Sequence, residues 1–288
     1  MGRAVTRPPG HPPVVLSIAG SDPSGGAGIQ ADLKTFSALG GYGCAVITAL
    51  TAQSTRGVSG VFPIPAGFVA EQLDALFADV GIDAVKVGMI ANAEIARAVA
   101  DALRRYAPPV VVLDPVMVAT SGDRLLAPDA EDVMRSELLP LADLITPNLD
   151  EAAALLGTQR AADADETRAQ SLALRAIGAR RVLLKGGHLV GPEATDYLVD
   201  SDGRVQELTA ERIDTANTHG TGCTLSSAVA VLRPGADDWF TAVQEAKAYL
   251  TTALRHADEL MIGGTGTDYS PYSGHGPVHH FSAMWPRR

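Results

Sequence analysis

The sequence predicts an α/β fold: a central, mostly parallel sheet with helices on both faces and an antiparallel hairpin at one edge. Two observations carry this prediction. Short apolar runs rich in Val, Ile and Leu alternate with longer segments of helical period. The runs are almost continuously apolar, as in strands that helices cover from both sides.

The expected elements follow one another along the chain. Apolar runs predict strands at 14–19, 44–50, 84–89, 110–116, 144–147 and 182–187. Helical periodicity predicts helices at 28–39, 66–80, 93–106, 128–139, 149–157 and 165–178. Segment 195–213 interrupts the alternation, because the turn residues 201–203 separate two alternating runs and predict a hairpin. Two further helices are expected at 222–232 and 238–260.

We expect one domain over residues 14–288, since 288 residues suffice for a large α/β domain and no internal repeat or linker divides them. Residues 1–13 are expected to be a disordered leader, because they carry arginines and prolines but no apolar segment of the secretory type. Segment 263–276 is rich in glycine, serine and tyrosine, which predicts a mobile loop.

Charge and composition exclude several classes of protein. The chain has 23 basic and 33 acidic residues, a net charge of −10 and a pI near 5.1, which argue against binding to nucleic acid or an anionic membrane. No apolar stretch approaches the ~20 residues of a membrane helix. The two cysteines, Cys44 and Cys223, are too few for a disulfide framework, so a reducing, cytoplasmic location is expected.

Candidate ligand-binding residues follow the predicted strands, because ligands of open parallel sheets bind beyond the carboxyl ends of the strands. Asp114 and Lys185 are conspicuous, since each is a lone charge at the end of an apolar run. Polar or flexible residues follow the other strands, at 20–32, Gln53, 88–89 and 146–151. All of them are expected to converge at one edge of the sheet.

The loop after the first strand admits a dinucleotide-binding interpretation. Residues 26–31, GAGIQA, match the fingerprint G-x-G-x-x-A. However, residues 20–25 separate the strand from this glycine, whereas the fingerprint needs a tight turn directly after the strand. The next strand also ends at 51–53, TAQ, without the acid that binds the ribose, so this interpretation is disfavoured. A Walker-type phosphate loop is excluded because no GxxxxGKS or GxxxxGKT sequence occurs.

Residues 217–228, NTHGTGCTLSSA, predict an anion-binding loop at the start of a helix. Its glycines permit close approach of a ligand, and the unpaired amides and dipole of a helix N-terminus favour an anion. The amides concerned belong to Gly220, Thr221, Gly222 and Cys223. The alternative is a tight turn between helices, with Thr218 or Thr221 as the helix cap.

Taken in order, these motifs resemble those of hydroxymethylpyrimidine/phosphomethylpyrimidine kinases, which belong to the ribokinase-like superfamily and serve thiamine biosynthesis. The resemblance runs from about residue 14 to 281 and includes AGSDPSGGAGIQAD, KVGMI, VLDPVM, SGDRLL, LITPNLDEAAALLG, LLKGGH, NTHGTGCTLSSA and GPVHHF. It implies a ribokinase-like fold and a kinase that uses ATP and Mg²⁺ and acts twice. The first reaction would phosphorylate the hydroxymethyl group of 4-amino-5-hydroxymethyl-2-methylpyrimidine, and the second would convert the monophosphate to the diphosphate.

The resemblance also implies a pyrimidine pocket. Carboxylate and amide groups suit the donor and acceptors of an aminopyrimidine, and apolar side chains suit its ring. Met89 or Val116 could equally fill the core, and Asp32 could be a charge in the first turn of a helix. The residues at the matching positions are Gly20, Asp32, Gln53, Met89, Val116 and Cys223.

Phosphate- and metal-binding roles follow from the same resemblance. Asn148 and Glu151 match an N-x-x-E pattern, in which Glu151 would order water around Mg²⁺ and Asp114 would add negative charge. Lys185 would bind the ATP phosphates as a point charge. Alternatively, Lys185 pairs structurally with Asp114 or Glu151.

Cys223 stands where related sugar kinases carry the aspartate that acts as general base. The helix N-terminus is expected to lower the pKa of this thiol, so that thiolate becomes available. We therefore expect Cys223 to accept the proton of the alcohol in the first reaction. The alternative is that Cys223 packs against the ring and contributes only its backbone amide.

Two other functions share parts of this pattern. A pyridoxal kinase is the closest alternative among enzymes, because relatives with this scaffold phosphorylate vitamin B6 alcohols, although Gln53 and Met89 favour the pyrimidine. Outside the enzymes, a pyrimidine or nucleotide sensor is possible in principle, but the complete set of catalytic residues argues against it. The resemblance further implies a homodimer, to which residues 55–64 could contribute.

Overall fold

The computed structural model describes residues 10–117, 128–187, 189, 191–263 and 274–285. Most of the expected leader and the expected mobile loop, at 1–9 and 264–273, therefore lie outside the described residues. The strands of the main sheet are β1 (Val14–Ala19), β2 (Tyr42–Ile47), β5 (Ala84–Val87), β6 (Val111–Leu113), β7 (Leu144–Ile145), β8 (Val182–Leu184), β9 (Glu193–Val199) and β10 (Val205–Glu211).

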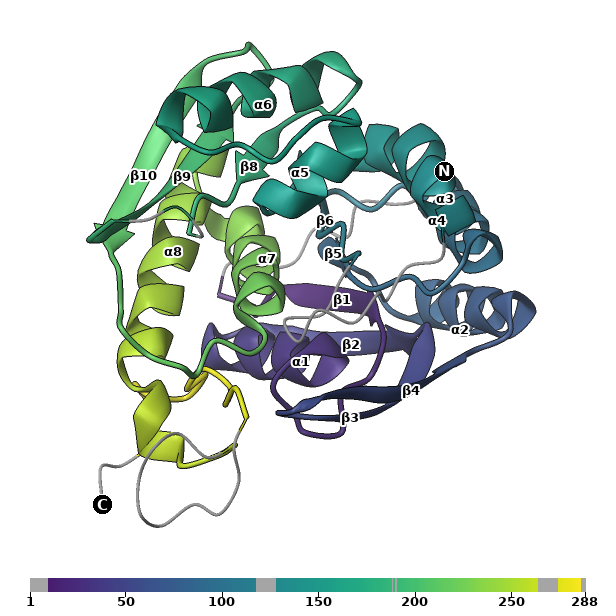
Figure 1. The fold of residues 1–288 in the computed structure, drawn as a ribbon. Helices are drawn as coiled ribbons and strands as arrows, with labels where there is room; N and C mark the ends of the chain where they lie inside the picture. The colour runs from purple at the N-terminus through teal and green to yellow at the C-terminus, as the bar shows by residue number, and fades with distance from the viewer. Residues whose placement is uncertain (1–9, 118–127, 188, 190, 264–273, 286–288) are drawn as a thin grey trace.

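These strands form one sheet in the order β10-β9-β8-β7-β6-β5-β1-β2 (Figure 1). The strands from β2 to β8 are parallel, and β9 and β10 extend the β8 edge as an antiparallel hairpin. The predicted fold class is confirmed, including the hairpin expected within 195–213.

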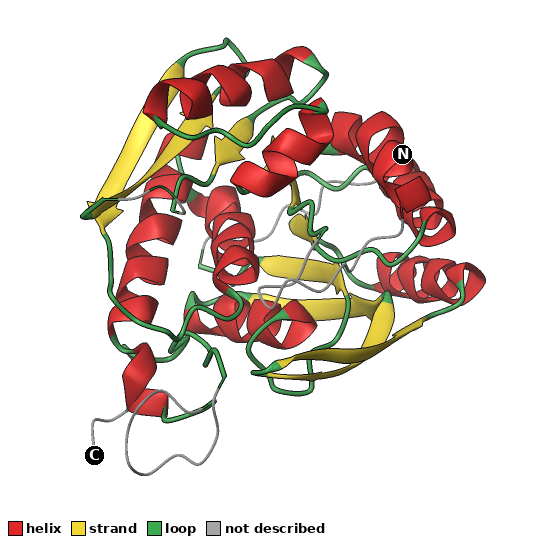
Figure 2. Cartoon of the chain, in the orientation of Figure 1, coloured by secondary structure: helices red, strands yellow, loops and turns green. Residues whose placement is uncertain are grey.

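Helices cover both faces of the sheet, as Figure 2 shows in red. On one face lie α1 (Gly28–Ala38), α7 (Thr221–Leu232) and α8 (Trp239–Arg255). On the other lie α2 (Ala66–Asp79), α3 (Ala93–Tyr106), α4 (Pro128–Val133), α5 (Leu149–Leu156) and α6 (Ala164–Ala176). Of the helices within the described ranges, none has the length and apolar character needed to cross a membrane.

Each face has its own core because successive strand residues point to opposite sides. In β1, Val15 joins the core beneath α1, α7 and α8, whereas Leu16 joins the core on the other face. The same alternation directs Ser17 of β1 and Lys86 of β5, which are register partners, towards the face of α1 and α7. Two polar side chains are thus placed inside the protein beneath these helices.

The predicted strand 44–50 is wrong in its second half. β2 ends at Ile47, and β3 (Ala49–Ser54) leaves the sheet to pair antiparallel with β4 (Gly57–Pro63) in a separate two-stranded sheet. The chain bends at Thr48, whose amide donates to the Ala19 carbonyl (3.0 Å) and whose carbonyl accepts from the Ile64 amide (2.9 Å). The first bond continues the ladder between β1 and β2, and the second joins Thr48 to the residue after β4, so Thr48 is the junction between the two sheets.

The hairpin changes the placement of Gln53. This residue does not end a strand of the main sheet; it lies on β3, which stands beside the carboxyl end of β1. The loop after β1 contacts β3 directly, since the Ser21 amide donates to the Ala49 carbonyl (2.9 Å). The sequence did carry a signal for β4, because the β-branched and aromatic residues Val58, Val61 and Phe62 follow Gly57.

Candidate active site

The carboxyl ends of β6 and β8 meet the start of α7. Lys185 Nζ lies 3.0 Å from Asp114 Oδ1. A Cβ atom added to Gly222 would lie 3.3 Å from Lys185 Nζ and 3.6 Å from Asp114 Oδ2, so the helix begins directly against this ion pair. The two lone charges lie together, as expected from their positions after the strands, and the glycine-rich loop lies against them.

Asp114 is held as a buried carboxylate. Its side chain accepts hydrogen bonds from the hydroxyls of Thr146 (3.0 Å) and Ser226 (3.4 Å) as well as from Lys185. Burial acts to raise its pKa, but the charges of Lys185 and Lys86 outweigh burial and lower the pKa of Asp114. Since Ser226 belongs to α7, its hydroxyl also ties this helix to the end of β6.

Asn148 and Glu151 form a capping box at the start of α5. The Asn148 side chain accepts from the Glu151 amide, and the Glu151 carboxylate accepts from the Asn148 amide, both at 2.8 Å. This reciprocal bonding fixes Glu151 Oε2 at 3.9 Å from Lys185 Nζ. The N-x-x-E spacing thus has a local structural cause, and it places a second buried carboxylate beside Lys185.

The pKa of Glu151 shifts in the opposite direction from that of Asp114. Burial raises the pKa of Glu151 to about 7, against the opposing charge of Lys185, and the nearby Asp114 acts in the same direction as burial. A cation brought to this place would relieve the repulsion between the two carboxylates. Carboxylate oxygens also suit Mg²⁺, which keeps several waters and needs few protein ligands.

The backbone conformation of Gly220 determines how the loop enters α7. Gly220 is the N-cap residue in the left-handed region (φ 77°), and no side chain caps the helix, so the alternative of a threonine cap does not hold. The Thr221 amide donates to the Thr218 carbonyl (3.3 Å). Of the four amides expected to bind an anion, Thr221's is therefore engaged, and those of Gly222 and Cys223 remain at the open end of the helix.

The residues expected around the pyrimidine come from three places in the fold. A Cβ added to Gly20 would lie 3.0 Å from Met89 Sδ, so the ends of β1 and β5 are in contact there. The Thr51 hydroxyl lies 2.8 Å from the Ser21 carbonyl and 3.3 Å from Gln53 Oε1, which brings the hairpin to the same loop. Val116 follows Asp114 and is half-buried.

Asp32 lies in a fully buried polar network. Lys86 Nζ is 2.9 Å from Asp32 Oδ1, and both side chains have 0% exposure. The hydroxyls of Ser17 (2.5 Å) and Ser227 (2.6 Å) also donate to the Asp32 carboxylate. In this arrangement Asp32 is engaged by side chains of β1, β5 and α7. Among these partners, only the lysine inside an apolar run is conspicuous in the sequence.

Cys223 lies one helical turn before Ser227. Burial raises the pKa of its thiol to about 11, and Lys86 opposes this effect while Asp32 and Asp114 reinforce it. The expected lowering of the thiol pKa by the helix N-terminus is therefore wrong. A hydrogen bond from the Gly28 amide, at the start of α1, acts to lower the pKa of the thiol, but loss of solvent around sulfur outweighs it.

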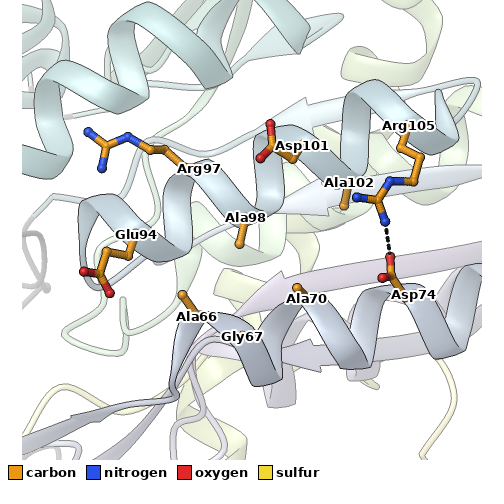
Figure 3. A pocket seen from close by; sticks show the side chains of 10 residues that line it. All are labelled: Ala66, Gly67, Ala70, Asp74, Glu94, Arg97, Ala98, Asp101, Ala102 and Arg105. Atoms are coloured by element: carbon orange, nitrogen blue, oxygen red, sulfur yellow. Dashed lines mark hydrogen bonds and ion pairs between the residues drawn. The ribbon is translucent and has the colours of Figure 1, made fainter.

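A cavity of about 400 Å³ opens elsewhere, between α2 and α3 (Figure 3). Small side chains of the two helices leave this space, and Arg105 pairs with Asp74 across it at 2.9 Å. It shares no residue with the cluster around Lys185. Its lining residues are Ala66, Gly67, Ala70, Asp74, Glu94, Arg97, Ala98, Asp101, Ala102 and Arg105.

Comparisons with known proteins agree with the motifs. A family model described as phosphomethylpyrimidine kinase matches residues 22–269. The hydroxymethylpyrimidine/phosphomethylpyrimidine kinase of Escherichia coli (strain K12) is 56% identical over 270 residues, covering 94% of this chain and 98% of that protein. Among solved structures, the ADP complex of Bacillus subtilis pyridoxal kinase has a TM-score of 0.82 at 34% identity and covers 94% of this chain and 98% of its own. A phosphomethylpyrimidine kinase from Clostridium difficile has a TM-score of 0.74 at 41% identity, covering 84% and 99%.

Proposed function

The chain belongs to the phosphomethylpyrimidine kinase family, and we propose that it uses ATP to phosphorylate 4-amino-5-hydroxymethyl-2-methylpyrimidine twice. The first transfer gives the monophosphate and the second gives the diphosphate, a precursor in thiamine biosynthesis. One observation carries the proposal: the glycine-rich start of α7 lies against Lys185 and Asp114.

Phosphoryl transfer depends mainly on positioning and on stabilisation of charge that spreads over the transferred group. Lys185 is suited to the ATP phosphates, since it is a cation with 15% of its side chain exposed at the strand end. The amides of Gly222 and Cys223 would stabilise the migrating group from the other side. In this proposal the Lys185–Asp114 pair orients the lysine, which turns towards phosphate when ATP binds.

Mg²⁺ would be held by Asp114 and Glu151, largely through water. The ion supplies neutralisation of phosphate charge when it is bound. Asn148 fixes Glu151 for this task through the capping box, and so acts on the nucleotide site indirectly. Glu151 would then remain ionised near neutral pH, because the cation offsets the effect of burial and of Asp114.

The acceptor would lie between the loop after β1 and the β3–β4 hairpin. Gly20 and Met89 supply a close apolar contact, and Gln53 supplies hydrogen-bonding groups on the side of the hairpin. Val116 would complete the apolar wall. Asp32 contributes either by exchanging a hydroxyl partner for the amino group of the pyrimidine or by fixing Lys86 beneath the pocket.

Single-turnover assays of the two steps test this proposal. Purified protein, ATP and Mg²⁺ are mixed with either the pyrimidine alcohol or its monophosphate, and both ADP and pyrimidine products are measured. We expect both acceptors to be phosphorylated and pyridoxal to react more slowly than the alcohol. Absence of ADP formation with both pyrimidines, or faster turnover of pyridoxal, would contradict the proposal.

The β3–β4 hairpin also supports a homodimer. Leu50 and Phe62 are register partners on one face of the hairpin, and they expose 46% and 64% of their surface. An exposed apolar pair of this kind is suited to burial against a second copy. A monomer in sedimentation equilibrium at assay concentrations would contradict the proposed homodimer.

A cytoplasmic location is consistent with the two unpaired cysteines, Cys44 and Cys223.

A further inference from the structure

We propose that His219 is a positioning residue, whose hydrogen bond to Asp22 holds the loop after β1 in register with the phosphoryl-binding start of α7. The inference rests on the kinase function proposed above. Neither residue has been given a role so far, although Asp22 belongs to the loop GSDPSGGAG and His219 to NTHGTGC.

Asp22 organises the whole loop after β1. It is 1% exposed, and its carboxylate accepts from three backbone amides, those of Ser24 (2.9 Å), Gly26 (3.1 Å) and Ala27 (2.8 Å). The Ser24 hydroxyl adds a further bond at 2.7 Å. One side chain thus determines the path of the loop that leads into α1.

His219 connects this loop to a distant part of the chain. Its Nε2 lies 2.8 Å from Asp22 Oδ2, and 8% of the histidine side chain is exposed. The His219 backbone is fixed in turn, since its amide donates to the Gly276 carbonyl (3.0 Å) and it bridges with Pro277. The ring therefore presents its nitrogen to Asp22 from an anchored position directly before Gly220.

The two loops also interlock sterically. A Cβ on Gly220 would overlap the Gly26 carbonyl, and a Cβ on Gly26 would overlap the His219 ring. Gly220 needs the left-handed conformation (φ 77°) that it adopts here, and glycine alone meets both demands without strain. The polar contact and the steric fit together allow one relative position of the loops.

The charge state of Asp22 keeps the contact in place at working pH. Burial acts to raise its pKa, but hydrogen bonds from His219 and Ser24 outweigh burial and lower the pKa of Asp22 to about 2. The charged Lys34 also lies near this loop, and its Nζ donates to the Gly25 carbonyl (2.7 Å). Because the carboxylate accepts, Nε2 of His219 carries the proton and donates.

This geometry has a consequence for the reaction. The loop after β1 contains Gly20 at the acceptor pocket, and its far end at Gly28 contacts the Cys223 thiol. The start of α7 provides the amides for the phosphoryl group. A shift of one loop against the other would therefore change the distance between acceptor and phosphoryl group, without changing how ATP contacts Lys185. Misplacement of about 1 Å can lower turnover by about 10²-fold.

Two substitutions separate positioning from simple packing. The side-chain nitrogen of glutamine extends about as far as Nε2 of histidine, whereas that of asparagine extends only about as far as Nδ1. We expect His219→Asn to lower kcat by about 10- to 100-fold in both phosphorylation steps, with KM for ATP within about twofold of the wild type. His219→Gln should retain kcat within about threefold, because it restores the hydrogen bond to Asp22.

Amide hydrogen exchange of residues 24–28 supplies a readout that does not depend on catalysis. We expect these amides to exchange faster in His219→Asn than in His219→Gln or the wild type. The exchange rates of amides in the strands should be the same in all three proteins. Equal kcat and equal exchange in the two variants would overturn the inference, as would a loss in His219→Asn that falls on KM for ATP. If the wild-type protein phosphorylates neither pyrimidine, the proposed function fails, while the exchange result still decides whether His219 holds the loop.

Discussion

Replacement of Cys223 by alanine is the most informative perturbation of the site, because the two proposed reactions make different demands on a base. The primary alcohol of the first step must lose its proton. The phosphate monoester of the second step is already largely anionic near neutral pH, since its second pKa is about 6. A base at residue 223 is therefore needed in the first step alone.

The structure sets the size of the expected effect. With a thiol pKa of about 11, about one molecule in a thousand carries thiolate at pH 8. A positioned base contributes about 10²- to 10⁴-fold, so Cys223→Ala should slow the first step by that factor. The second step should lose less than about tenfold, because only packing and the geometry of the loop are altered.

Rates of both steps are measured separately in single-turnover experiments between pH 7 and pH 9.5. Below its pKa the thiolate fraction rises about tenfold per pH unit, so the wild-type first step should accelerate with pH while the second stays flat. A solution pre-equilibrium to alkoxide would give the same slope, and Cys223→Ala distinguishes the two by removing the thiol. Equal losses in both steps would refute the base assignment and favour a packing role for Cys223.

The other predictions concern residues around the same cluster. Gly222→Val places side-chain atoms beside Lys185 and should lower kcat at least about a hundredfold, with little change in pyrimidine affinity. Near-normal kcat in a folded variant would contradict the anion-binding role of the loop. Lys185→Ala should impair both steps, whereas Gln53→Ala should raise KM for the pyrimidine alone; the reverse pattern would show that the two sites are wrongly assigned. Burial raises the pKa of Glu151 from 4.5 to about 7, so the folded state binds this proton more tightly than the unfolded state and loses stability as pH rises through that range. Glu151→Gln should therefore raise Tm at pH 8 without Mg²⁺ while lowering kcat, and an unchanged Tm would contradict the shifted pKa.

The convergence of Asp114 and Lys185 was predictable because the topology of a parallel sheet converts sequence order into proximity. Each residue follows a buried strand, and the carboxyl ends of such strands share one edge. The interruption of an apolar run by a charge was the useful signal, since an isolated charge is rarely buried without a partner. Which partner it has is decided by the fold.

Two features were not predictable from local pattern. Thr48 at the bend accepts a hydrogen bond from Ile64, which lies beyond β4, so the apolar run 44–50 looks like one strand although two sheets share it. The pairing of Lys86 with Asp32 joins residues 54 positions apart, across β5 and α1. Desolvation makes such a pair obligatory once both groups are buried, but no local periodicity records it.

The same buried pair offers a physical reason for a thiol at residue 223, where related sugar kinases carry an aspartate. Asp32 and Asp114 both raise the pKa of Cys223, which means that two acids already act on this position, and Lys86 opposes them, while Lys185 also lies within electrostatic reach of the thiol. A third carboxylate there would add like charge in a buried place, and such groups retain a proton. We therefore expect Cys223→Asp to give a first step slower than the wild type but faster than Cys223→Ala, with a rate that rises with pH through an apparent pKa well above that of an ordinary aspartate. A rate that is flat from pH 6 to pH 9 would mean that Lys86 compensates all three acids, and the electrostatic reason for the thiol would then be wrong.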